Sequence, residues 1–135
     1  MQRLYETHKD IAEFRIVYIN EAHPADGDWP VEFAKEKGLT EHLTYHDRCT
    51  SAEMMLVEEA VTIPCLIDNM DNKVNEAYSA WPDRIFVVRT DGTLAVAGKR
   101  GPFGFAPAIK ETAEWLAAYR AAAATPTKPQ EQESE

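Results

Sequence analysis

Short runs rich in β-branched residues alternate with segments of helical periodicity along most of this chain. The strand-like runs cover residues 14–19, 63–67, 84–89 and 93–97. Alternation of this kind is typical of an α/β fold, because a helix that links two strands packs back onto the sheet they form. The predicted order is helix, strand, helix, strand, helix, hairpin, helix.

The helices are predicted from apolar spacing and from capping residues. Leu4, Tyr5 and His8 recur at helical spacing, so a helix begins at residue 2 or 3, although Met1-Gln2 provides no capping side chain. Residues 50–53, Thr-Ser-Ala-Glu, match a capping box that opens a helix through about residue 60. Asp71 is the predicted cap of the next helix.

The last third of the chain contains the clearest turn signal. Residues 90–92, Thr-Asp-Gly, separate two strand-like runs and predict a hairpin. A loop over residues 98–107 then precedes a final helix on which Ile109, Ala113 and Leu116 share one stripe. Residues 121–135 begin with four alanines and become polar and acidic, so we expect a disordered tail after a domain over residues 1–120.

Length and charge narrow the function classes. A chain of 135 residues is sufficient for one core and one domain. Its net charge of −9 disfavours nucleic acid as a partner. No apolar run approaches the roughly 18 residues that span a bilayer, and residues 1–6 lack the apolar stretch of a signal peptide. We therefore expect a soluble, cytoplasmic protein without a membrane partner.

The two cysteines, Cys49 and Cys65, do not form a Cys-x-x-Cys motif. The predicted helix between them rises about 15 Å, which exceeds the roughly 7 Å between the Cα atoms of a disulfide. Cys49 adjoins the predicted helix start, where the helix dipole lowers a thiol pKa. Cys65 is equally well explained as a small buried strand residue.

Ionisable side chains follow the first strand, at the edge where α/β sheets build their sites. Tyr18 ends that strand, and Glu21 and His23 lie two residues apart in the polar loop behind it. A glutamate and a histidine whose pKa values lie near the operating pH are suited to proton transfer. The alternative is that both residues only tie down a turn.

Four motifs resemble the iodothyronine deiodinase family, and they occur in that family's order between Met1 and about Tyr119. The motif with the most detail runs from Tyr18 to Trp29, although Asn20 replaces a glutamate and Asp28 is inserted. The other three are Asp68-Asn69-Met70-Asp71-Asn72 with Ala77-Tyr78, then Pro82-Asp83-Arg84-Ile85-Phe86-Val87, and then Gly101-Pro102-Phe103-Gly104-Phe105-Ala106-Pro107.

The resemblance implies a thioredoxin-like fold, a mixed sheet flanked by helices, with Pro64 as the candidate cis-proline at a strand entry. It also implies that the central strand and its loop, which carry selenocysteine or cysteine in this selenoprotein family, are missing here. Loss of that strand exposes two ladders of backbone groups, so self-association, such as a homodimer, is expected. The brevity of the chain and the lack of an anchor favour a bacterial relative.

The resemblance further implies a thiol or selenol oxidoreductase for the reductive dehalogenation of iodothyronine-like phenols, or for thioredoxin-like redox chemistry on peroxides or disulfides. Tyr18, Glu21 and His23 match the family's proton relay, and Cys65 lies near its resolving cysteine. The remaining expectations are His46 at the phenol end of the substrate, Arg100 at its carboxylate, an external thiol reductant and no cofactor.

Two alternatives stay open from the sequence. A metal site formed by His23, Asp26, His42 and His46 matches no familiar ligand spacing, so no metal is expected. Without its nucleophile the chain is predicted to be inactive, and the rival hypothesis is a non-catalytic binding or assembly module on a thioredoxin fold. That module would use Arg100 and the His23 loop to hold a small anionic aromatic ligand.

Overall fold

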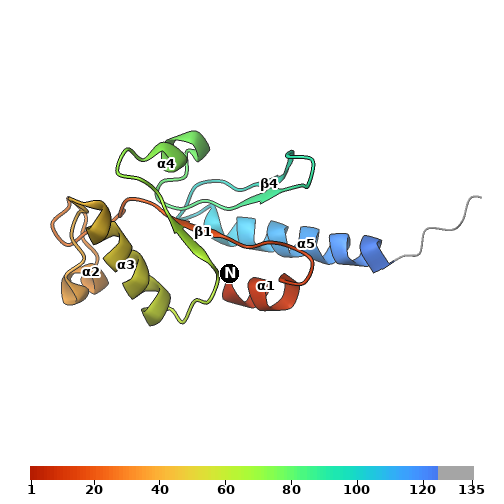
Figure 1. Ribbon diagram of the computed structural model, residues 1–135, viewed down its shortest axis with the longest axis horizontal. Helices are drawn as coiled ribbons and strands as arrows, with labels where there is room; N and C mark the ends of the chain where they lie inside the picture. Colours follow the sequence, from red (N-terminus) through yellow and green to blue (C-terminus); the bar gives the residue numbers. More distant parts are fainter. Residues whose placement is uncertain (125–135) are drawn as a thin grey trace, which may run out of the picture.

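The computed structural model describes residues 1–124, in which helices surround two small sheets (Figure 1). No helix in this part of the chain is long and apolar enough to cross a bilayer. The elements in chain order are α1 (Gln2–His8), β1 (Ile16–Tyr18), α2 (Glu32–Lys37), α3 (Tyr45–Glu58), β2 (Cys65–Ile67), α4 (Lys73–Tyr78), β3 (Phe86–Val88), β4 (Leu94–Ala97) and α5 (Phe105–Ala124).

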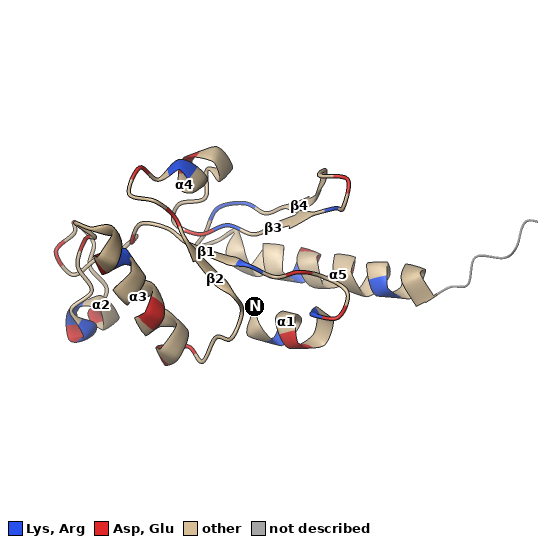
Figure 2. Ribbon diagram, viewed as in Figure 1, with Lys and Arg blue, Asp and Glu red and all other residues tan. Residues whose placement is uncertain are grey.

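The strands form two separate pairs (Figure 2). β1 and β2 are parallel, with Ile16 opposite Cys65 and Tyr18 opposite Ile67. β3 and β4 form the antiparallel hairpin that the Asp-Gly signal predicts, with one register irregularity after Val87. The mixed α/β architecture confirms the predicted fold class, and within residues 1–124 no ladder joins the two pairs.

The start of α3 corrects the sequence-based prediction. The helix begins at Tyr45, and Thr44 and Asp47 form its capping box, because the Thr44 hydroxyl accepts from the Asp47 amide while the Thr44 amide donates to the Asp47 carboxylate. Thr50 lies inside the helix, and its hydroxyl donates to the carbonyl of His46 one turn earlier. Cys49 is therefore in the second turn and not beside the helix start.

A second correction concerns the start of α4, where Asn72 is the N-cap residue and Asp68, rather than Asp71, forms the shorter hydrogen bonds to the first-turn amides. The Asp68 side chain is buried and accepts from the amides of Val74, at 3.1 Å, and Asn75, at 2.9 Å. Its own amide donates to the carbonyl of Tyr18. Asp68 thus connects the end of the β1–β2 pair to the first turn of α4.

The short helix α2 was not predicted, and α5 is longer than predicted. α2 begins after Val31 without a side-chain cap and ends at Gly38, which has the left-handed conformation that favours glycine (φ 65°). Residues 121–124 continue α5, so the prediction of a disordered tail from residue 121 was wrong for these alanines. Residues 125–135 lie outside the described part of the chain.

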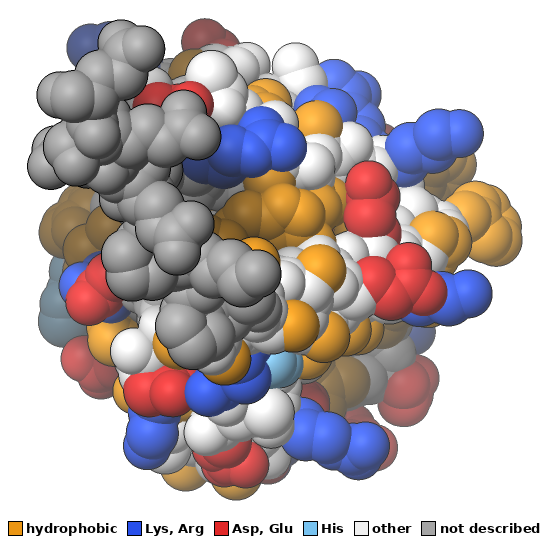
Figure 3. Space-filling model, turned by 90° about the vertical axis from the view of Figure 1, so that its right-hand side faces the viewer, with side chains coloured by type: hydrophobic (Ala, Val, Ile, Leu, Met, Phe, Trp, Pro, Cys, Tyr) orange, Lys and Arg blue, Asp and Glu red, His pale blue; other side chains and the backbone are white. Residues whose placement is uncertain are grey.

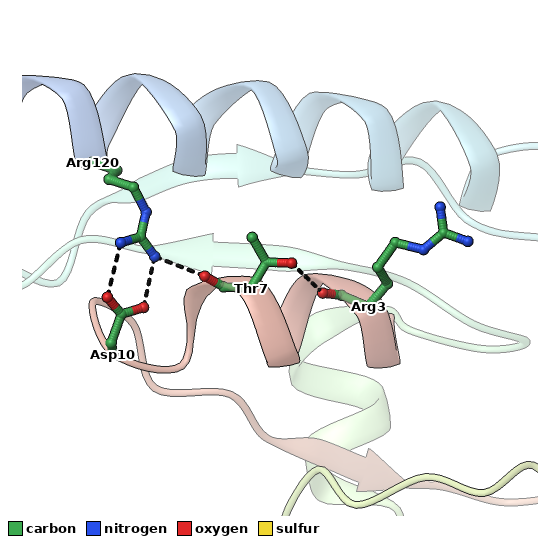
Figure 4. A network of polar contacts seen from close by, with 4 residues as sticks. All are labelled: Arg3, Thr7, Asp10 and Arg120. Atoms are coloured by element: carbon green, nitrogen blue, oxygen red, sulfur yellow. Dashed lines mark hydrogen bonds and ion pairs between the residues drawn. The ribbon is translucent and has the colours of Figure 1, made fainter.

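The main core cluster consists of Phe14, Ile63 and Leu116, which join the segment before β1, the segment before β2 and α5. A polar clasp also holds α5 against the end of α1 (Figure 4). The Arg120 guanidinium donates to both carboxylate oxygens of Asp10, at 2.8 and 2.6 Å, and to the carbonyl of Thr7 at 2.7 Å. These contacts fix the first helix of the chain against the last one.

The prediction of a cis peptide bond at Pro64 was wrong. In the described residues the cis bonds precede Pro82 and Pro102. Pro64 precedes β2 with the trans bond that most X–Pro sequences prefer, and its carbonyl accepts from the amide of Ile16 at 2.9 Å. Pro64 is therefore a conventional strand-entry proline that begins the parallel ladder.

Candidate functional site

A large apolar groove separates the two strand pairs. Its volume is about 1670 Å³, and β1 and β3 form its walls. Hydrophobic side chains surround a hollow on the face of the molecule seen in Figure 3. The groove is also lined by parts of α4 and α5, including Val74, Tyr78, Trp115 and Leu116.

One end of the groove contains the predicted cluster that follows β1. The Tyr18 hydroxyl donates a short hydrogen bond to the carboxylate of Glu21. Burial raises the pKa of Glu21, and the neighbouring His23 lowers it by a smaller amount. The Nδ1 atom of His23 lies 2.9 Å from the carbonyl oxygen of Trp29, a contact that holds the exposed ring at the loop. The structure thus brings together Tyr18, Glu21 and His23.

His42 joins this cluster from the loop before α3. Its ring centroid lies 6.0 Å from that of Tyr18. Nε of the buried Arg48 donates to Nδ1 of His42 at 3.4 Å, while the Arg48 guanidinium also donates to the carbonyls of Asp68 and Asn69. Burial is the main cause that lowers the pKa of His42, and the charge of Arg48 lowers it further.

The tautomer of His42 follows from these contacts. Because Nδ1 accepts a hydrogen bond, the proton of the neutral ring is on Nε2. Nε2 is buried and has no hydrogen-bond partner within residues 1–124. It is therefore a buried donor, and His42 is not among the residues that line the groove. The sequence analysis named His42 only as a candidate metal ligand and did not place it beside Tyr18, although the capping box at Thr44 would have placed it in the loop outside the helix.

A second polar group faces the groove near the predicted arginine. One carboxylate oxygen of Asp83 is buried without a partner in the described residues, and burial raises the pKa of this carboxyl. The Asp83 carboxyl lies against Gly101, where a side chain would not fit. Arg100 precedes this glycine and is exposed, with Nε donating to the carbonyl of Ser79 at 2.8 Å.

The remaining predicted residues lie elsewhere. His46 is exposed in the first turn of α3, so His42 and not His46 is the histidine beside Tyr18. Cys65 begins β2 opposite Ile16, whereas Glu21 lies beyond the far end of β1. The Cys65 thiol contacts the carbonyl of Leu66, and burial raises the pKa of this thiol. Cys49 and Cys65 are both free cysteines.

The cluster is suited to moving protons. Within residues 1–124, no group of three or more His, Cys, Asp or Glu side chains is arranged to hold a metal ion. Tyr18 and Glu21 share a hydrogen bond, and the pKa of Glu21 is raised toward neutral pH. The arrangement supports general acid–base chemistry at the end of an apolar groove.

Comparison with known proteins assigns the sequence to a family. The sequence model described as iodothyronine deiodinase matches residues 1–120. Similar curated proteins include thyroxine 5-deiodinase of Sparus aurata, which is 40% identical over 122 residues. That of Gallus gallus is 37% identical over 119 residues, and the type II iodothyronine deiodinase of Homo sapiens is 33% identical over 119.

These three matches cover 85–88% of the chain but only 42–44% of the relatives. The chain therefore spans less than half the length of each of these proteins.

Proposed function

The chain belongs to the iodothyronine deiodinase family, and we propose that its Tyr18, Glu21 and His23 cluster supplies the proton in a reductive dehalogenation of an iodinated phenol. The observation that carries this proposal is the hydrogen bond from Tyr18 to Glu21, whose carboxyl has a raised pKa. A carboxyl that holds its proton more strongly than an ordinary glutamate is better suited to act as a general acid.

The reaction requires two thiol equivalents. A thiolate or selenolate attacks the iodine, the carbon–iodine bond breaks, and the ring carbon takes a proton, which Glu21 provides with Tyr18 and His23 as its relay. A second thiol then attacks the sulfur or selenium atom and displaces iodide, so that the two thiols become a disulfide or selenenyl sulfide. The electrons come from an external thiol reductant, and the proposed reaction requires no further cofactor.

Neither Cys49 nor Cys65 is placed to act as the nucleophile. Cys65 is at the opposite end of the strand pair from Glu21, and burial raises the pKa of its thiol, which disfavours the thiolate. Cys49 is in the second turn of α3 and contacts Tyr45. We therefore expect the chain alone to release no iodide, because neither cysteine lies in the cluster.

Two polar sites are available to the ends of the substrate. Tyr18 and Glu21 line one end of the groove and suit a phenolic oxygen. Arg100 suits a carboxylate, because a guanidinium donates two parallel hydrogen bonds. The carboxyl of Asp83, a residue that lines the groove, suits an ammonium group nearby. This set fits an iodothyronine-like amino acid, and peroxides or disulfides are the broader substrate class.

The test is iodide release from an iodinated phenol in the presence of a dithiol. The chain is extended at Met1 by an apolar strand and a loop that carries a cysteine, the segment that the family resemblance implies. The extended chain is expected to release iodide, and Glu21→Gln to lower the rate by about 10²-fold or more. The matched control is Glu36→Gln on the exposed surface of α2. Equal rates for both variants would remove Glu21 from the mechanism.

The position of the cysteines also favours a second candidate, a non-catalytic module that holds an anionic aromatic ligand with Arg100 and the His23 loop. The two functions differ in the effect of the extension. A binding module takes up an iodinated phenol with the same affinity in both forms and never releases iodide. Location in the cytoplasm, a bacterial source and a homodimer stay predictions.

A further inference from the structure

Large apolar residues are exposed on the lobe that contains α2 and the start of α3, away from the hairpin and α5 (Figure 1). Leu43 is 84% exposed and Trp29 is 77% exposed. Tyr45, the first residue of α3, is also exposed. We call these three residues the lobe patch. Several large apolar residues exposed in one part of a surface, with polar residues around them, are typical of an interaction site.

Two loops of this lobe run side by side. The amide of Ala25 donates to the carbonyl of Leu39 at 2.6 Å, and the carboxylate of Asp26 accepts from the amide of Glu41 at 2.8 Å. The patch residues of the two loops follow these contacts by two or three residues. The patch is therefore formed by two segments that the backbone holds together.

The backbone of the patch is also fixed at its ends. Nδ1 of His23 lies 2.9 Å from the carbonyl oxygen of Trp29, and the capping box of Thr44 and Asp47 holds the chain before Tyr45. A surface that is ordered before binding loses less conformational freedom on association. Tryptophan and tyrosine are also enriched among the residues that contribute most at protein interfaces. The patch thus has the composition and the order of a protein-binding surface.

The charge around the patch selects the partner. Residues 26–47 contain six carboxylates and two lysines, a net charge of −4 in a chain whose net charge is −9. Both lysines have carboxylate partners, because Lys35 lies 3.8 Å from Glu32 and Lys37 lies 2.8 Å from Glu58. A second copy of this lobe and an anionic membrane carry the same sign of charge, so repulsion opposes both. A surface rimmed by lysine or arginine is complementary to the lobe.

We propose that the lobe patch binds a second protein whose contact surface has an apolar centre and a rim of lysine or arginine. Leu43 and Trp29 pack into the apolar centre of that surface, and the carboxylates of residues 26–47 pair with its basic rim. The partner lies beside the His23 loop, because the His23 ring contacts the backbone of Trp29. The docking rests on the exposed residues and their charge and does not depend on the proposed reaction.

The probe is a synthetic amphipathic helical peptide with leucine on one face and lysine along both flanks of that face. NMR titration of the full chain is expected to shift the indole N–H of Trp29 and the amide of Leu43, with one peptide bound per chain. A second peptide has glutamate in place of every lysine and keeps the apolar face. It is expected to bind at least tenfold more weakly, and 0.5 M salt should remove most of that difference.

Variants of the chain locate the contact. Leu43→Ser and Trp29→Ser each remove an apolar side chain of the patch and are expected to weaken binding of the lysine peptide at least tenfold. The matched control is Phe103→Ser, because Phe103 is 92% exposed but precedes α5, outside the lobe. The control is expected to bind the peptide as the unchanged chain does. Circular dichroism of each variant verifies that it is folded.

Several results would overturn the proposal. The folded chain may not bind the lysine peptide at all, or it binds both peptides equally at low salt. Shifts confined to β1 and β3 would place the peptide in the groove instead. Equal weakening by Phe103→Ser and Leu43→Ser would remove the lobe from the contact.

Two further results would replace the partner. A dimer by light scattering that Leu43→Ser dissociates would make a second copy the occupant. Binding to phosphatidylserine vesicles that Leu43→Ser abolishes would make a membrane the occupant. Iodide release by the extended chain is a separate measurement, and its failure would refute the proposed reaction without affecting the docking.

Discussion

The hydroxyl of Tyr18 donates a hydrogen bond to the carboxylate of Glu21 three residues later, across the end of β1. This contact places a carboxyl in a partly buried position at the mouth of the groove. Burial raises the pKa of this carboxyl, and the charge of His23 lowers it by a smaller amount.

Glu21 is expected to make stability depend on pH. Burial raises the pKa of Glu21 in the folded chain, so the folded state binds this proton more strongly than the unfolded state does. Stability should therefore fall as the pH rises from the ordinary glutamate pKa through the raised one. Glu21→Gln should stabilise the protein by up to about 1 kcal/mol at pH 7 and by nothing at pH 3.

Urea denaturation at the two pH values measures this difference. An equal effect of the variant at both would contradict a raised pKa.

Arg48 is expected to be the most sensitive side chain near the cluster. It is 2% exposed and donates to the carbonyls of Asp68 and Asn69 at 3.0 and 2.7 Å. Arg48→Met leaves both carbonyls without this donor and should cost about 2–4 kcal/mol of unfolding free energy. Because the charge of Arg48 also lowers the pKa of His42, the variant should raise that pKa.

Denaturation measures the first effect and NMR titration of the His42 ring the second. Arg3→Met is the control, since the Arg3 side chain is exposed and points away from the clasp in Figure 4. A variant of Arg48 as stable as this control would contradict a structural role for the buried guanidinium.

Asp68 is expected to hold α4 in place. Its buried carboxylate accepts from the amides of Val74 and Asn75, so Asp68→Ala should cost about 1–2 kcal/mol. Hydrogen exchange at those two amides should accelerate. Asp71→Ala provides the comparison, because the Asp71 side chain is exposed and its contact with the Lys73 amide is long, at 3.4 Å. An equal loss of stability in both variants would contradict the role of Asp68 at the start of α4.

The clasp between Arg120 and Asp10 is expected to act as a salt-sensitive contact between α5 and α1. The hydrogen bond from Arg120 is the largest cause that lowers the pKa of Asp10. The stabilisation is therefore present above the ordinary aspartate pKa and is lost as the pH falls through the lowered one.

A double-mutant cycle of Arg120→Ala and Asp10→Asn should give a favourable coupling that weakens in 1 M salt. A coupling of zero at low salt would mean that the pair does not stabilise the docking of α1.

Local signals were sufficient for the strands and the hairpin. The β-branched runs and the Asp91-Gly92 turn determine β3 and β4 through adjacent residues alone. The start of α3 was misassigned because two capping patterns of equal spacing lie six residues apart, at Thr44 and Thr50. The hydroxyl of Thr50 is satisfied by the preceding turn, so the earlier pattern caps the helix.

Tertiary contacts explain what the sequence did not predict. The Asp68 carboxylate reaches the first-turn amides of α4 because the chain turns back through the N-cap residue Asn72, which has a left-handed conformation (φ 54°). His42 reaches Tyr18 because Arg48 holds its ring from α3, although 24 residues separate the two in the chain. Tyr18, Glu21 and His23 were predictable because one strand and its loop carry all three.

The most direct measurement is the pH dependence of iodide release by the extended chain and by its Glu21→Gln variant. If Glu21 is the proton donor, the rate of the extended chain falls as the pH rises through the raised pKa of Glu21, and the variant loses this descending limb. A variant that keeps the same limb and the same rate would contradict proton delivery by the Tyr18–Glu21 pair.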